Sequence, residues 1–311
     1  MMTRNELKEL IVGPIATVPT PFDEEYEVDF GRMAELTEWW VESGLVSGKA
    51  VIKVAAAMGE GPLLRDSEWM HLLRTVVQAA DGQATVACGL HYKDAKNSIE
   101  DAKRAQDLGA VCLQISPPIF NDPTQDDIFR YFEAVSDAID IGILVYNTYW
   151  WPGGNILPET FHKMKDLEHV VAIKWGVPEE QDYDDMEGLV DAFNIIDNSN
   201  QPVRCHKLGG RGFINVTAEV YPPHDLKVWE LMENGEYDEA HSLFHSVNDP
   251  LTEMYVEMCG KSGGQARLKK ALMEVMGHPV GPSRPPSLPA SATELAQLRD
   301  LLESFGWPVP A

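Results

Sequence analysis

A lysine closes an apolar stretch of the sequence, at a position where its amine could do covalent chemistry. Lys174 follows the run 170–173, which is typical of a buried strand. Burial disfavours the charged ammonium, so it lowers the pKa of a lysine and leaves a free amine that can attack a carbonyl carbon. The alternative is that Lys174 extends its amine into solvent from the strand end.

A tyrosine closes a second apolar stretch further upstream. Tyr146 follows the run 141–145, and its phenol could give a proton to, or take one from, an adduct on Lys174. The alternative is an ordinary aromatic residue of the interior whose hydroxyl is already hydrogen-bonded. If both strands are parallel, their ends meet at one mouth of a barrel, which would bring Tyr146 and Lys174 together.

Strands and helices alternate along most of the chain, which predicts an α/β fold, a (β/α)₈ TIM barrel. A doubly wound sheet is the alternative, but its glycine-rich dinucleotide turn is replaced here by Pro19-Thr20-Pro21. Strands are predicted at 13–22, 50–56, 84–89, 111–116, 141–146, 170–174, 193–197 and 212–216. The main helices between them are predicted at 68–80, 95–108, 127–139, 158–167 and 183–192.

The last third of the chain carries helix patterns without strands. Helices are predicted at 226–234, 237–258 and 266–276, and a final one begins after Ser291. We therefore predict two parts, a barrel over residues 1–221 and a C-terminal helical appendage over residues 222–311. The appendage would cover the flank of the barrel or form an oligomer contact.

Composition and charge exclude several classes of partner. The formal net charge of -24, from 49 acidic and 25 basic residues, argues against nucleic acid and anionic membranes. The four cysteines form no zinc or redox motif, which favours a reduced, cytoplasmic protein. We find no apolar segment of signal-peptide or membrane-spanning length.

Several short motifs, in this order and spacing, resemble a known family. They are Thr20-Pro21-Phe22-Asp23, Gly59-Glu60, Val145-Tyr146-Asn147, Ile173-Lys174 and the segment 210–216. Together they are similar to the dihydrodipicolinate synthase and N-acetylneuraminate lyase family, a class I aldolase superfamily, over nearly the whole chain. No single motif is decisive, but the set is specific.

The resemblance implies the chemistry. Lys174 would form a Schiff base with a 2-oxo acid, usually pyruvate, and Tyr146 would move protons. Neither a metal nor an organic cofactor would be needed, and the protein would be a homotetramer, a dimer of dimers. Substrate contacts would come from Gly59, Glu60 and Ile214.

His91, followed by Tyr92, stands at the end of the third predicted strand and could hydrogen-bond a hydroxyl or a carboxylate. The alternative is a structural histidine. Glu60 could also serve mainly to order its own loop.

Three departures from the family pattern concern the substrate. Ala57-Met58 stand where the family has two threonines, so their amides remain but the hydroxyls are lost. Phe120 stands where the synthases have the tyrosine given by a neighbouring subunit, and Trp151 where they have an arginine that binds the second substrate's carboxylate. An apolar stacking surface in place of an anion-binding group favours an aromatic or apolar second carbonyl substrate. Trp151 and Trp175 could instead seal the barrel top or a subunit contact.

The functional hypothesis is a class I aldolase-type lyase that makes or breaks a carbon–carbon bond between a 2-oxo acid and a second carbonyl compound. A hydro-lyase, including a hydratase-aldolase, that acts through the same iminium is the alternative. A third hypothesis, of another class, is a barrel that has lost catalysis and serves as a binding or structural protein.

Overall fold

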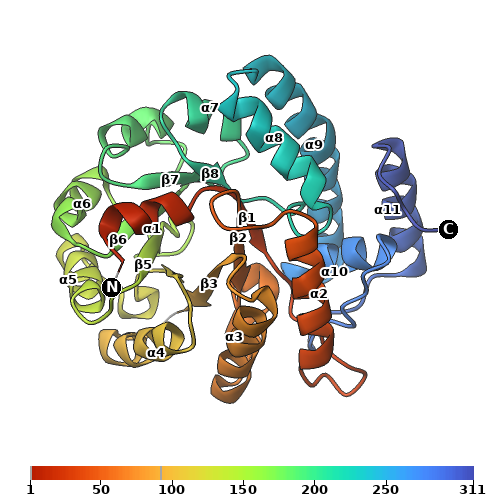
Figure 1. The fold of residues 1–311 in the computed structure, drawn as a ribbon, viewed down its shortest axis with the longest axis horizontal. Helices are drawn as coiled ribbons and strands as arrows, with labels where there is room; N and C mark the ends of the chain where they lie inside the picture. The colour runs from red at the N-terminus through yellow and green to blue at the C-terminus, as the bar shows by residue number, and fades with distance from the viewer. Residues whose placement is uncertain (1, 92) are drawn as a thin grey trace.

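The strands close into a barrel whose axis is surrounded by helices (Figure 1). The computed structural model describes residues 2–91 and 93–311. Within them, eight parallel strands pair in sequence order and β8 returns to β1, which confirms the predicted (β/α)₈ barrel. The strands are β1 (Gly13–Thr17), β2 (Val51–Val54), β3 (Thr85–Leu90), β4 (Cys112–Ile115), β5 (Gly142–Tyr146), β6 (Val170–Trp175), β7 (Asn194–Asp197) and β8 (Gly212–Phe213).

Helices cover the outside of the barrel and form the C-terminal region. The α-helices are α1 (Arg4–Leu10), α2 (Phe30–Glu42), α3 (Asp66–Ala80), α4 (Ala95–Asp107), α5 (Gln125–Ser136), α6 (Pro158–Lys163), α7 (Pro202–Lys207), α8 (Pro222–Glu233), α9 (Tyr237–Lys261), α10 (Ala266–Val275) and α11 (Ala292–Ser304). Short 3₁₀ turns are η1 (Ala57–Gly59), η2 (Gly61–Leu63), η3 (Ile119–Asn121), η4 (Met164–Asp166) and η5 (Tyr183–Gly188). None of the helices in the described residues is long and apolar enough to cross a membrane.

Local sequence fixes where several helices begin. Thr124 caps α5 by accepting from the amide of Asp127, whose carboxylate accepts from the amide of Thr124 in return. Ser291 and Glu294 make the same reciprocal pair at the start of α11. Each pair satisfies amide groups that a helix start would otherwise leave without partners, so the predicted helix after Ser291 is confirmed.

Side chains alternate between the barrel interior and the layer under the helices. The interior contains Ile15, Val51, Leu144 and Ala172, and it is closed at one end by Leu7 of α1. Figure 1 shows α1 lying across that end of the barrel. The opposite end, where the strands finish, stays open for a site, as in other barrels of this kind.

One predicted helix was wrong in type. The segment predicted as a helix over 183–192 contains only the 3₁₀ turn η5, which stops at Gly188. The Asp182 side chain accepts from the amide of Asp184, which supports a tight turn at the start. Residues 189–192 form turns that lead into β7, and Leu189 and Phe193 are fully buried there.

The C-terminal helices share the core of the barrel. Helix α8 follows β8 and packs against β1, so it completes the outer ring. Val247 and Leu251 of α9 and Leu272 of α10 belong to the same apolar cluster as the barrel's outer layer. The division at residue 221 stays a prediction, and it falls before the helix that completes the last βα unit.

A buried ion pair ties α10 to the barrel. Lys269 is fully buried, and its ammonium contacts the carboxylate of Glu219 and donates to the backbone oxygen of Thr17 over 2.6 Å. Glu219 is also fully buried, and its backbone oxygen accepts from the indole of Trp40. Because a charge buried without its partner is strongly destabilising, this pair constrains the position of α10 on the barrel.

Candidate active site

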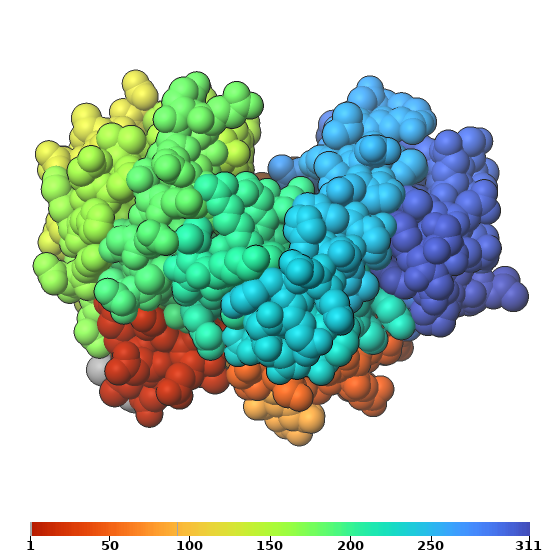
Figure 2. Space-filling model, turned by 90° about the horizontal axis from the view of Figure 1, so that it is seen from above, coloured from red at the N-terminus to blue at the C-terminus, as the bar shows by residue number. Residues whose placement is uncertain are grey.

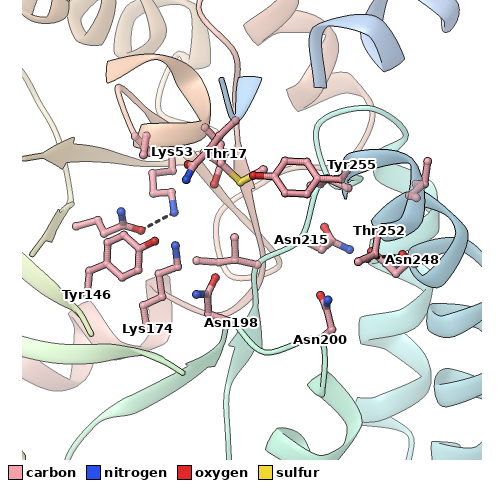
Figure 3. A pocket seen from close by; sticks show the side chains of 18 of the residues that line it. Thr17, Lys53, Tyr146, Lys174, Asn198, Asn200, Asn215, Asn248, Thr252 and Tyr255 are labelled. Carbon is pink, nitrogen blue, oxygen red and sulfur yellow. Dashed lines mark hydrogen bonds between the residues drawn. The ribbon is translucent and has the colours of Figure 1, made fainter. Parts of the chain in front are cut away.

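A cavity of about 360 Å³ lies at the carboxyl ends of the strands, a size that suits a small organic substrate. Figure 2 shows the molecule hollowed between the yellow and green segments and the blue C-terminal helices. The cavity is lined by side chains from the barrel and from α9 (Figure 3). They are Thr17, Lys53, Ala56, Ala57, Met58, Gln114, Tyr146, Trp150, Lys174, Asn198, Asn200, Ile214, Asn215, Val216, Asn248, Leu251, Thr252, Tyr255 and Gln265.

Lys174 lies on the cavity wall with its amine turned inward. Only 6% of the residue is exposed, and its Nζ lies 3.7 Å from the ring centroid of Tyr146. Burial, and then the charges of Lys53 and Lys269, hold the pKa of Lys174 well below its usual range. These causes favour the neutral amine, which is the form of lysine that attacks a carbonyl carbon.

The backbone brings Tyr146 to the same place. Tyr146 of β5 and Lys174 of β6 are direct register partners, so their side chains leave the sheet on the same face. The next residue, Asn147, is fully buried; it donates to the oxygen of Gly176 and accepts from the amide of Ile156. The first bond fixes the end of β5 against the end of β6, and the second fixes it to the loop before α6. Figure 3 shows the Tyr146 hydroxyl on the side of the Lys174 amine.

A second lysine in this cavity was missed from the sequence. Lys53 of β2 is 1% exposed, and its Nζ donates to Oε1 of the buried Gln114 side chain over 2.6 Å. The signal was a lone lysine within the apolar strand 51–54, at an inward position next to Thr17 of β1. An inward-pointing lysine in such a strand predicts a polar interior site.

Helix α9 forms the other wall of the cavity, which the sequence did not predict. Asn248, Leu251, Thr252 and Tyr255 all line it. They follow a spacing of three or four residues, which is one face of a helix. The appendage therefore contributes to the site itself, beyond covering the barrel flank.

Five of the predicted residues meet in the cavity. Lys174 and Tyr146 are joined there by Ala57, Met58 and Ile214. Ala57 and Met58 belong to the turn η1 directly after β2, and Ile214 directly follows β8. Their shared position agrees with substrate contact, although their individual roles stay predictions.

Gly59 and Glu60 are not on the cavity wall. A Cβ atom at Gly59 would lie 2.4 Å from the backbone oxygen of Val18, so only glycine fits this close approach. Glu60 pairs with Lys270 at 2.7 Å and accepts from the amide of Arg284 over 3.1 Å. These contacts agree with the interpretation that Glu60 orders its loop.

His91 also lies beside the cavity rather than on its wall. Its Nε2 is 3.0 Å from the backbone oxygen of Ala55, and burial is the main cause that lowers the pKa of His91 to about 4. The imidazole is therefore neutral near neutral pH. Tyr92, which was named with it, lies outside the described residues.

The predicted aromatic residues lie in different environments. Phe120, in η3, is 79% exposed, and Trp151 is 46% exposed; neither lines the cavity. Trp150, the neighbour of Trp151, does line the cavity. Its indole packs edge-on against Tyr146, with the ring centroids 5.6 Å apart. Trp175 was expected near the mouth, but it is fully buried and its indole donates to the oxygen of Tyr183. It points outward because Lys174, one residue earlier, points inward.

The polar groups on the cavity wall are amines, amides and hydroxyls. Among the described residues there is no group of three or more His, Cys, Asp or Glu placed to hold a metal ion. The wall therefore offers the Lys174 amine together with groups that can donate protons or hydrogen bonds to an anionic substrate.

The chain is similar to known proteins in sequence and in fold. The model of the dihydrodipicolinate synthetase family matches residues 11–305. A 4-hydroxy-tetrahydrodipicolinate synthase of Heliobacterium modesticaldum is 28% identical over 296 residues, covering 94% of this chain and 95% of that protein. A protein of the same name from Clostridium novyi is 29% identical over 298 residues, covering 95% and 97%.

Solved structures agree in fold over nearly the full length. Dihydrodipicolinate synthase of Thermotoga maritima superposes with a TM-score of 0.85 at 25% identity, covering 96% of this chain and 99% of that one. The enzyme of Acinetobacter baumannii, solved in complex with pyruvate, gives a TM-score of 0.82 at 23% identity, with coverage of 95% and 99%. These similarities extend across the barrel and the C-terminal helices.

Proposed function

Because the chain belongs to the dihydrodipicolinate synthetase family, we propose that it is a cytoplasmic class I aldolase-type lyase in which Lys174 forms a Schiff base with a pyruvate-like 2-oxo acid. The family match confirms the resemblance in the motifs and the prediction of an enzyme, a lyase. The observation that carries the proposal is the buried Lys174 amine, 3.7 Å from the Tyr146 ring centroid in a cavity at the barrel mouth.

The first step is attack of the Lys174 amine on the keto carbon. This step needs a neutral nitrogen, and burial next to other lysines lowers the pKa of Lys174 in the required direction. Loss of water then gives an iminium, whose positive nitrogen withdraws electrons from the neighbouring carbon. The C3 hydrogens of the acid become acidic as a result.

Tyr146 is placed to handle the proton at C3. Its hydroxyl lies on the side of the Lys174 amine, and the pair is held by the β5–β6 register (Figure 3). Removal of a C3 proton gives an enamine, which attacks the second carbonyl carbon and forms the new carbon–carbon bond. The reverse sequence of steps breaks that bond, and hydrolysis of the iminium releases the product.

The cavity wall suggests an aromatic or apolar second substrate. Trp150, Leu251 and Tyr255 supply apolar surface, and the wall formed by described residues contains no arginine. An arginine would bind a carboxylate with two parallel hydrogen bonds, whereas aromatic rings favour stacking. Trp150, rather than Trp151, is the tryptophan on the wall.

A hydro-lyase is the second candidate, for one specific reason. Two side chains that can donate protons, Lys53 and Tyr146, lie on the wall around Lys174. Either could protonate a hydroxyl group as it leaves an enamine, which would make the reaction a dehydration instead of an aldol cleavage. The two reactions share every step up to the enamine and differ in their products.

Borohydride trapping tests the proposal. We expect that incubation with pyruvate and sodium borohydride raises the intact mass of the protein by the mass of the reduced adduct. The reason is that borohydride reduces an iminium to a stable secondary amine. Other 2-oxo acids, including ones with aromatic substituents, form the rest of the panel. An unchanged mass with every acid of the panel would refute the Schiff-base mechanism and favour a barrel without catalysis.

We also propose that the chain forms a homo-oligomer, a dimer of dimers, through a surface near the mouth. Phe120, Trp150, Trp151 and Leu157 are between 42% and 79% exposed. The two loops that carry them are neighbours, since the Gln125 side chain bonds the backbone of 155 and 157. Exposed apolar groups gathered in this way are typical of an interaction surface. Sedimentation that gives the mass of a single chain would contradict this proposal.

A further inference from the structure

Two lysine amines share the active cavity, and the mechanism above uses only one. Lys53 is almost completely buried and lines the same cavity as Lys174. Figure 3 shows the ends of the two side chains pointing toward one another beside the Tyr146 ring. Lys53 cannot reach solvent from the barrel interior, so its amine is not accounted for by a surface role. Among the described residues, the Lys53 amine hydrogen-bonds the Gln114 side chain.

The surroundings of the two amines differ. The Gln114 carbonyl accepts a hydrogen bond from Lys53, which stabilises the charged form of that lysine. The Lys174 amine faces an aromatic ring, and each cause acting on the pKa of Lys174 lowers it. Two like charges in one cavity repel, so these surroundings favour the charged form at Lys53 and the neutral form at Lys174.

Charged and titratable groups face Lys53 from several elements. Burial, and then the charge of Lys269 on α10, lower the pKa of Lys53 to about 7, while Glu219 and Cys112 act in the opposite direction. Lys269 is already paired with Glu219. The other titratable groups near Lys53 are Lys174 of β6, the phenol of Tyr146 of β5 and the neutral His91 at the end of β3.

We propose that Lys53 is a further catalytic residue, the proton donor that expels water from the carbinolamine formed at Lys174. This inference rests on the proposed Schiff-base function and assigns a step within it. The geometric support is the placement of both amines on one cavity wall, with Lys53 held by Gln114. Tyr146 then remains available for the proton at C3.

The step balances in atoms and charge. Addition of the Lys174 nitrogen to the keto carbon, with transfer of a proton from nitrogen to oxygen, gives a neutral carbinolamine. The Lys53 ammonium then gives one proton to the departing hydroxyl, the carbon–oxygen bond breaks, and the nitrogen lone pair forms the carbon–nitrogen double bond. Water leaves, Lys53 becomes neutral, and the positive charge now resides on the Lys174 nitrogen.

The number of charges in the cavity therefore stays constant. Without such a donor, iminium formation would either place a second positive charge beside the Lys53 ammonium or release hydroxide into a buried site. Both are unfavourable in a cavity with few solvating groups. Transfer of the proton from Lys53 avoids both, because one positive charge only moves from one nitrogen to its neighbour. The proton returns when the iminium is hydrolysed.

The test measures the rate of adduct formation as a function of pH. Enzyme and pyruvate, or the panel acid that traps best, are mixed and quenched with borohydride at successive times, and the adduct is counted by intact mass. The variants are Lys53→Met, Lys53→Arg and Gln114→Glu. Lys49→Met is the matched control, because Lys49 precedes β2 at the far end of the strand and is exposed.

For the wild type we expect the rate to fall as pH rises through about 7, because Lys53 then loses the proton that it must donate. Lys53→Met should slow adduct formation by about 10²–10⁴-fold near neutral pH and abolish this fall. Lys53→Arg keeps the charge, but a guanidinium holds its protons too tightly to act as the acid, so adduct formation should be slow as well. The control should behave like the wild type.

Gln114→Glu keeps Lys53 and places a carboxylate against it. The carboxylate stabilises the ammonium and raises the pKa of Lys53, so the fall in rate should move to higher pH. If the Lys53 variants do not fold, Gln114→Glu still tests whether Lys53 donates the proton. Two results would overturn the role of Lys53 but leave the Schiff-base function standing. One is a Lys53→Met enzyme that traps pyruvate as fast as the wild type. The other is a fall in rate that stays at the same pH in Gln114→Glu. A wild type that traps no acid overturns the proposed function together with it.

Discussion

Lys174→Ala is expected to abolish the borohydride-trapped adduct and to lower kcat/KM by at least about 10⁴-fold, the largest effect that we expect from any single substitution. The methyl group of alanine cannot attack a carbonyl, and no covalent intermediate can form. Lys53 does not replace it, because Lys53 is the residue that keeps the proton. The measurement is intact mass after reduction with pyruvate, together with turnover of the substrate that the panel identifies.

The matched control for this experiment is Lys103→Ala, which removes an exposed lysine of α4. It should keep both the adduct and the turnover of the wild type. Peptide mapping of the reduced wild-type enzyme should place the added mass on the peptide that contains Lys174. Mapping to Lys53 instead, or an adduct that persists in Lys174→Ala, would show that the nucleophile has been assigned to the wrong amine.

Tyr146→Phe is expected to lower turnover by about 10²–10⁴-fold while the adduct can still be trapped. The substitution removes only the hydroxyl and keeps the ring that lies 3.7 Å from the Lys174 Nζ and packs against Trp150. The packing around the lysine should therefore be preserved. The informative readout is exchange of the C3 hydrogens of pyruvate with deuterium in heavy water, followed by NMR, since this exchange reports proton removal directly.

The control for this prediction is Tyr149→Phe, the same change on a tyrosine of the adjacent loop that packs edge-on against Trp150. Its exchange rate should equal that of the wild type. Slow C3 exchange with fast adduct formation would separate the role of Tyr146 from that of Lys53. Exchange at the wild-type rate in Tyr146→Phe would remove Tyr146 from the proton-transfer step.

The barrel and the pairing of Tyr146 with Lys174 could be predicted from the sequence because both depend on short-range patterns. Apolar runs of strand length alternate with helical periodicity, and that alternation is typical of a parallel barrel. In such a barrel the ends of all strands meet, so Tyr146 and Lys174 had to be neighbours once β5 and β6 were identified. The outward direction of Trp175 could also have been predicted, because it follows from the inward direction of Lys174.

The remaining features of the site depend on contacts that no local pattern encodes. The wall formed by α9 requires the C-terminal helices to fold back over the mouth, and nothing in the spacing of Asn248 or Tyr255 indicates where that face will dock. The choice between Trp150 and Trp151 depends on the loop after β5. There the Thr148 backbone oxygen accepts from the Trp151 amide, and the Gly154 oxygen accepts from the Thr148 amide. Of the two indoles that this tight turn carries, the one on the cavity wall is Trp150. Residue types alone do not determine the direction of side chains in such a turn.

The bond between Lys269 and Thr17 joins residues that are 252 positions apart, nearly the two ends of the chain. During synthesis, β1 leaves the ribosome early, whereas α10 emerges only after the whole barrel. The charge of Lys269 lowers the pKa of both Lys53 and Lys174, so the barrel lacks part of the electrostatic environment of its nucleophile until that late helix has docked. The three causes that lower the pKa of Lys174 therefore act together only after α10 has docked on the barrel.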